Sequence, residues 1–98
     1  MKTIKKLTGH EYAQCHVEIF DSGSIYFFSY QTMIALIAPD EPKGERWLYI
    51  SHLCSPTTRK QLGWFLKEYC DMRYQTAKDL YYNNERYCLD TGEIESLN

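Results

Sequence analysis

Long apolar runs are missing from this sequence of 98 residues. The most apolar segment, Ile25 to Ala38, is broken by the polar stretch Ser29–Thr32 and falls short of the roughly 20 residues that a membrane-spanning helix needs. The basic start Met1–Lys6 is not followed by the apolar region of a signal peptide. We therefore expect a cytoplasmic protein without membrane association, in which the four cysteines stay reduced.

An excess of charge of one sign is also missing. The 11 Lys and Arg residues nearly balance the 13 Asp and Glu residues, and the net charge is −2. This balance argues against nonspecific electrostatic binding to nucleic acid.

Metal-binding spacings are equally scarce. The sequence has no C-x-x-C or H-x-x-x-H motif, and its closest groupings are Cys15-His16 and His52-x-Cys54. Neighbouring residues of a strand point to opposite faces, so Cys15 and His16 cannot share one ion. His52 and Cys54 would share a face of a strand, and zinc favours such ligands, but buried reduced Cys is common without a metal. We predict neither a metal nor a cofactor.

Catalytic constellations are absent as well. Cys54 precedes a predicted helix, where the helix dipole lowers a thiol pKa, and His52 could serve as its base. Nucleophilic catalysis also needs oxyanion donors and a substrate site, for which the sequence gives no signal. The acidic residues show no paired, apolar-flanked arrangement. We predict that the protein is not an enzyme.

The clearest element that is present is a helix over about residues 56–72. Ser55 is a good N-cap and Pro56 suits the first helical position. The apolar positions follow an i, i+3, i+4, i+7, i+8 pattern: Leu62, Phe65, Leu66, Tyr69 and Cys70. A short second helix is expected over about 76–87, capped by Thr76, and then a polar tail over about 91–98.

Alternating segments before this helix predict an antiparallel sheet of about four strands within residues 13–51. Thr3–Leu7 is a candidate short edge strand, and Tyr30–Thr32 reads as a turn or bulge. Residues 39–44 form the clearest loop. The whole chain, residues 1–98, is then a single α+β domain in which one main helix packs on the sheet.

The alternation gives this sheet two different faces. Val17, Ile19, Leu48 and Ile50 are expected to meet the main helix. Trp47 and Tyr49, together with Tyr26 and Phe28, fall on the opposite face. Such an aromatic face needs a cover, which the second helix or a homodimer partner could supply.

Trp64 departs from the helix pattern because it falls on the polar side, between Lys60 and Lys67. One interpretation is that a loop or the C-terminal segment covers it. The other is that Trp64, Lys60 and Lys67 contact a protein partner, since Trp is enriched at such contacts.

Short motifs make the chain resemble a family of small uncharacterised proteins of bacteriophages and mobile elements. The motifs are Phe28-Ser-Tyr-Gln-Thr32 with Ile34-Ala35, then Tyr49-Ile-Ser, and Pro56-Thr-Thr-Arg-Lys60. Lys60 stands where that family often has His. The resemblance implies a small accessory protein in the cytoplasm of a bacterial host, and no known activity.

The same motifs suggest a structural lock. Ser29, Tyr30 and Thr32 would lie beside the helix start Ser55, Thr57 and Thr58, with the Thr58 hydroxyl bonded to backbone of the strand break.

We therefore expect a non-enzymatic protein that acts by binding another protein, for example as an inhibitor of a host defence system, through Trp64, Trp47 and Tyr49. One alternative is a nucleic-acid-associated regulator that uses Arg59, Lys60 and Lys67. Another is a small-ligand or anion site at the helix start.

Overall fold

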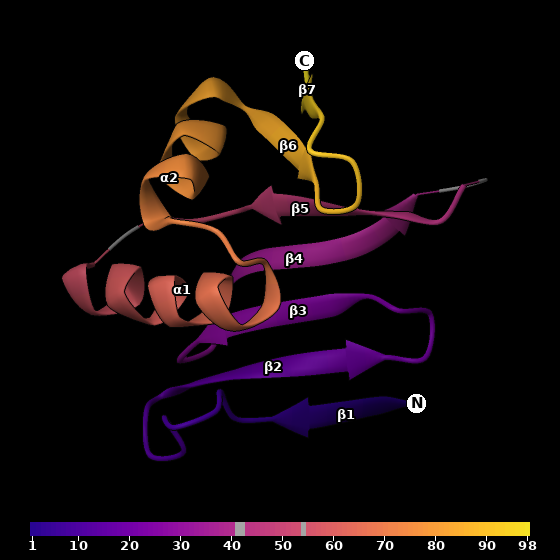
Figure 1. Ribbon diagram of the computed structural model, residues 1–98. Coiled ribbons are helices and arrows are strands. Elements are labelled where there is room, and N and C mark those ends of the chain that lie inside the picture. The colour runs from indigo at the N-terminus through magenta and orange to yellow at the C-terminus, as the bar shows by residue number, and fades with distance from the viewer. Residues whose placement is uncertain (41–42, 54) are drawn as a thin grey trace.

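The computed structural model describes residues 1–40, 43–53 and 55–98. Seven strands form one antiparallel sheet in which spatial order follows chain order, β1 to β7 (Figure 1). The strands are β1 Lys2–Lys5, β2 Cys15–Phe20, β3 Ile25–Ser29, β4 Thr32–Asp40, β5 Glu45–Ile50, β6 Glu85–Cys88 and β7 Ile94–Ser96. Two helices, α1 Pro56–Tyr69 and α2 Tyr74–Asn83, lie between β5 and β6 in the chain.

Both helices pack on the same side of the sheet (Figure 1). Helix α1 begins where the sequence predicts, because the Ser55 hydroxyl accepts the Thr58 amide and Pro56 occupies the first turn. Helix α2 ends at Asn84, whose φ of 54° is a left-handed cap that Asn tolerates well.

One core joins this side of the sheet to both helices. Phe27 of β3 stacks on Phe65 of α1, with ring centroids 4.7 Å apart. The other buried apolar side chains of this core come from β2, β4, β5, both helices and the β1–β2 connection: Cys15, Val17, Ile34, Ala35, Ile37, Leu48, Leu62, Leu66, Ala77, Leu80 and Leu7. Helix α2 thus contributes Ala77 and Leu80 to the α1 side and does not cover the aromatic face.

The prediction of about four strands is wrong, although the α+β class and the antiparallel pairing hold. The sheet extends beyond residues 13–51 at both edges, through β1, β6 and β7. Residues 85–87, expected to end the second helix, belong to β6 because Asn84 turns the chain back toward β5. The polar tail contains β7, whose three residues are all exposed, so no apolar pattern marked it. Helix α1 ends at Tyr69, before the predicted residue 72.

Candidate protein-binding face

The side of the sheet opposite the helices carries a row of side chains that crosses all seven strands. Strand register places Ile4 beside Glu18, Glu18 beside Tyr26, Tyr26 beside Leu36, and Leu36 beside Tyr49. The β5–β6 register continues the row to Arg86, and Arg86 pairs with Glu95 of β7. We call this side the helix-free face, and this set of seven residues the central row: Ile4, Glu18, Tyr26, Leu36, Tyr49, Arg86 and Glu95.

Further apolar and aromatic side chains flank the central row on the same face. Phe28 of β3 stacks on His16 of β2 with centroids 5.0 Å apart and planes 4° apart. Phe20 contacts Tyr26 at 4.8 Å between centroids. Phe28, Phe20 and Tyr26 are only half-buried, because the described chain places no helix over them. The face is therefore a broad aromatic surface on one side of a two-layer fold.

Arg86 organises the end of this face nearest β7. Its guanidinium lies 3.8 Å from the centre of the Trp47 ring and donates to the Tyr49 hydroxyl at 2.8 Å. It also pairs with Asp40 at 3.3 Å and with Glu95. The Glu95 hydrogen bond is the main cause that raises the pKa of Arg86, so this side chain stays charged. Stacked in this way, Arg86 leaves Trp47 only 2% exposed.

A second, smaller cluster of paired charges lies at the β1–β2 end of the same face. Lys2 donates to Glu18 at 3.0 Å, and His16 lies 3.2 Å from the other Glu18 oxygen. These hydrogen bonds, first that of Lys2 and then that of His16, hold the pKa of Glu18 below its ordinary value. Both clusters thus bring opposite charges together beside aromatic rings.

The residues predicted to bind a partner divide between the two sides of the molecule. Trp47 and Tyr49 lie on the helix-free face, whereas Trp64, Lys60 and Lys67 lie on α1. Trp64 is covered by the β1–β2 connection, because His10 stacks on it with centroids 3.6 Å apart and planes 9° apart. Lys60 adds a cation over the same ring at 5.6 Å. The geometry thus shows a loop over Trp64, the first of the two interpretations.

The helix start makes a buried hydrogen-bond network with β3. Ser29 Oγ lies 3.1 Å from Thr58 Oγ1 and donates to Gln61 Oε1 at 2.6 Å. Ser55 completes the network by donating to Thr58 Oγ1. The expected contact to backbone at the strand break is replaced by one between side chains, and Gln61 is a member that sequence reasoning missed. Thr57 and Thr32 are exposed and lie outside the network, as does Tyr30.

The start of α1 is already occupied by its own chain. Ser55 Oγ accepts the Thr58 amide at 3.1 Å, and Pro56 has no amide hydrogen to offer. An anion would have to displace the cap, which makes the small-ligand alternative at this end unattractive. The proposed nucleophile Cys54 lies outside the described residues.

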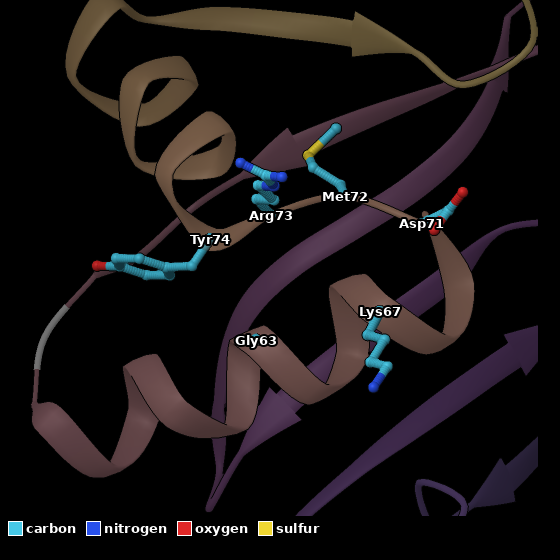
Figure 2. Close-up of a pocket in the computed structure, with 6 residues that line it drawn as sticks. All are labelled: Gly63, Lys67, Asp71, Met72, Arg73 and Tyr74. Carbon is cyan, nitrogen blue, oxygen red and sulfur yellow. The ribbon is translucent and has the colours of Figure 1, made fainter.

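Two shallow hollows flank Lys67 on the outer surface of α1. One, of about 460 Å³, is lined by the residues labelled in Figure 2, from Gly63 on α1 to Tyr74 at the start of α2. Figure 2 shows that Lys67, Asp71 and Tyr74 point in different directions. The other, of about 520 Å³, includes His10 and Trp64. Neither hollow gathers groups that could bind one ligand or carry out a reaction together.

Burial keeps two of the cysteines, Cys15 and Cys70, in the thiol form. Burial raises the pKa of Cys70 to about 12, with Arg46 opposing the shift, and burial also raises the pKa of Cys15. Both thiols are therefore protonated and unreactive at neutral pH. Across the described ranges, no group of three or more His, Cys, Asp or Glu side chains could hold a metal ion. In the same ranges, none of the helices has the length and apolarity to cross a membrane.

Comparison with known proteins gives one result. Residues 2–86 match a family of unknown function, DUF8033. The chain belongs to this family. No curated protein and no solved structure matches the chain. The DUF8033 match runs from β1 to Arg86 and so includes six of the seven members of the central row.

Two parts of the helix-free face of this DUF8033 member were missed by sequence reasoning. Arg86 was placed in a helix, so its position over Trp47 and Tyr49 could not be foreseen. Leu36 was expected in a strand, but its face depends on the register of β4. That register shifts at a bulge between Phe27 and Phe28. The sequence indicated a turn or bulge a few residues later, at Tyr30–Thr32.

Proposed function

We propose that this chain is a non-enzymatic protein-binding module and that the helix-free face is its binding surface. The partner would present a flat surface of apolar and aromatic groups with charges at its edges. The observation that carries this proposal is the central row, in which an unbroken line of side chains crosses a sheet that has helices on one side only.

The composition of the face suits a protein interface. Tyr and Trp are enriched where proteins meet, since they offer large contact areas at low entropic cost. A β-sheet with one uncovered aromatic face exposes more apolar surface than an isolated domain needs. Tyr26, Phe28 and Leu36 supply that surface near the centre of the face.

Charge on this face is arranged in a way that tolerates burial. Glu18 is paired with Lys2 and His16, and Arg86 with Asp40 and Glu95. Burying an unpaired charge is strongly unfavourable, whereas burying a hydrogen-bonded pair costs much less. A nucleic acid would instead require an excess of cations, which this face does not have.

The biological setting follows from the motif resemblance alone. We propose an accessory role in a bacteriophage or mobile element, with inhibition of a host defence protein as one form of that role.

A pair of matched variants tests the proposal. Leu36→Glu introduces a charge at the centre of the helix-free face, whereas Lys67→Glu alters the exposed side of α1 and serves as the control. Partners should be recovered with the tagged wild-type chain, identified, purified and titrated against all three chains by calorimetry. We expect at least tenfold weaker binding for Leu36→Glu and no more than a twofold change for Lys67→Glu. The reverse pattern would place the interface on the helix side and overturn the proposal.

A further inference from the structure

The central row nearly mirrors itself about Leu36. Tyr26 and Tyr49 are its immediate neighbours on the two sides, in register with it. One step further out, Glu18 stands on one side and Arg86 on the other. The row therefore has a Tyr on each side of Leu36 and opposite charges, Glu18 and Arg86, one strand farther out.

We propose that the partner on the helix-free face is a second copy of this chain. The two sheets would pack face to face around a two-fold axis that runs parallel to the strands and passes over β4. This inference rests on the proposed function for the identity of the surface, and it adds the identity and orientation of the partner. An isologous contact of this kind closes as a dimer.

The symmetry decides which side chains meet. Rotation about this axis reverses strand order, so β3 lies over β5 of the other copy, and β2 lies over β6. Leu36 meets Leu36 on the axis, and Tyr26 meets Tyr49 of the other copy. Glu18 then faces Arg86 of the other copy, so each dimer contains two such charge pairs. Electrostatic complementarity of this kind selects partner and register.

The sheet ends agree with the same axis. Lys2 lies at the β1 end, with a side chain that is 47% exposed, and Glu95 lies at the β7 end, with one that is 46% exposed. The axis places β1 over β7 of the other copy, so Glu95 meets Ile4, and Lys2 lies two residues farther along β1. A two-fold axis that runs along the central row, across the strands, would instead stack each strand on itself and oppose Glu18 to Glu18 and Arg86 to Arg86.

The dimensions of the molecule leave room for an interface of standard size. The molecule measures 36 × 31 × 21 Å, and its thin dimension corresponds to one sheet and one helix layer. The two longer dimensions, 36 and 31 Å, bound a rectangle of roughly 1,100 Å², so a face of these dimensions has room for the approximately 800 Å² per partner that a standard-size interface buries. Aligned sheets cross at about 30°, which displaces rows little near the axis, and Glu and Arg side chains are long enough to bridge the offset farther out.

The test exploits the position of Leu36 on the axis. Leu36→Glu and Leu36→Lys each place two like charges against one another in a homodimer, whereas a mixture of the two places opposite charges together. In sedimentation equilibrium, we expect the wild type to be dimeric. Each variant alone should dissociate at least tenfold more readily, and the equimolar mixture should recover most of the loss as a 1:1 heterodimer. Lys67→Glu should sediment as the wild type does.

The orientation has its own test. Glu18→Arg and Arg86→Glu should each weaken the homodimer and should pair when mixed. Circular dichroism confirms folding first, because Arg86 also has partners within its own chain; if Arg86→Glu does not fold, the Leu36 mixture decides. Recovery by the Leu36 mixture without recovery by the Glu18 and Arg86 mixture would overturn the orientation.

Two outcomes would overturn the second copy as the occupant. A wild-type dimer that both Leu36 variants leave intact would place the dimer contact elsewhere. A wild type that is monomeric up to high micromolar concentration would exclude the dimer. If the wild type is monomeric and binds a purified foreign protein that Leu36→Glu does not bind, the proposed function is still supported. If the wild type instead binds an oligonucleotide that Leu36→Glu does not bind, both the dimer and the proposed function are overturned.

Discussion

Replacing Ser29 with alanine should destabilise the fold through the partners that it leaves behind. Ser29 is 2% exposed, and its hydroxyl contacts Thr58 and Gln61, each 4% exposed. In Ser29→Ala, Gln61 Oε1 loses the donor that the structure shows for it. Thr58 Oγ1 keeps its contact with Ser55, 3.1 Å away.

The magnitude follows from that difference. One buried acceptor left without a donor costs about 1–3 kcal/mol, and Thr58 adds little because Ser55 still satisfies it. For a domain of this size, each kcal/mol lowers Tm by about 4–8 °C. Ser29→Ala should therefore lower the free energy of unfolding by about 2 kcal/mol and Tm by roughly 8–16 °C.

Urea unfolding followed by circular dichroism measures this loss. Thr57→Ala is the matched control, since Thr57 is an exposed residue next to the network, and should change stability by less than about 0.5 kcal/mol. The double variant Ser29→Ala with Gln61→Leu should recover part of the loss, because it removes the stranded acceptor. A Ser29→Ala chain as stable as Thr57→Ala would refute the network as a stabilising link between β3 and α1.

Three other residues give further predictions. Trp64→Ala should lower the free energy of unfolding by about 2 kcal/mol, measured by urea unfolding, because it removes the ring that stacks on His10. The sedimentation of this variant should match that of the wild type. Burial raises the pKa of Cys70 to about 12, so the folded chain holds that proton more tightly than the unfolded chain. This contribution to stability is complete below the ordinary thiol pKa of about 8.5 and is lost as pH rises from there toward 12. The unfolding midpoint of Cys70→Ala should therefore fall less steeply than that of the wild type over this pH range. Tyr30 has a φ of 57°, so Tyr30→Gly should stay near wild-type stability, whereas Tyr30→Val should lose about 1–2 kcal/mol by thermal unfolding.

Local signals predicted the middle of this chain well. The alternation in β2 and β5 comes from period-2 patterns that short-range sterics and burial impose. The polar interruption at Tyr30–Thr32, interpreted as a turn or bulge, lies where β3 ends and β4 begins. The start of α1 follows from Ser55 and Pro56, which act within a few residues of themselves. Features determined at that range can be predicted without knowing the rest of the fold.

The C-terminal third could not be predicted in the same way. Asn84 reads as a weak helix residue, and only its left-handed backbone shows that it ends α2 and starts β6. Strand β7 is polar because it lies at an exposed edge, so hydrophobic alternation is absent there.

Only part of the candidate site could be predicted. Placing Trp47 and Tyr49 on the face away from α1 required only alternation within β5. Adding Arg86 required long-range pairing of β5 with β6, and the central row required the register of every strand. Trp64 illustrates the opposite case: its helical position is predictable, but the loop residue His10 that covers it is distant in sequence.

Cross-linking at the centre of the helix-free face tests the central claim most directly. Leu36→Cys and Lys67→Cys should be treated with a short bis-maleimide, with the unsubstituted chain as the blank for the native cysteines. If the helix-free face is the surface on which two copies meet, Leu36→Cys forms a covalent dimer at micromolar concentration and Lys67→Cys does not. Equal cross-linking of the two variants, or none for a folded Leu36→Cys, would contradict the account.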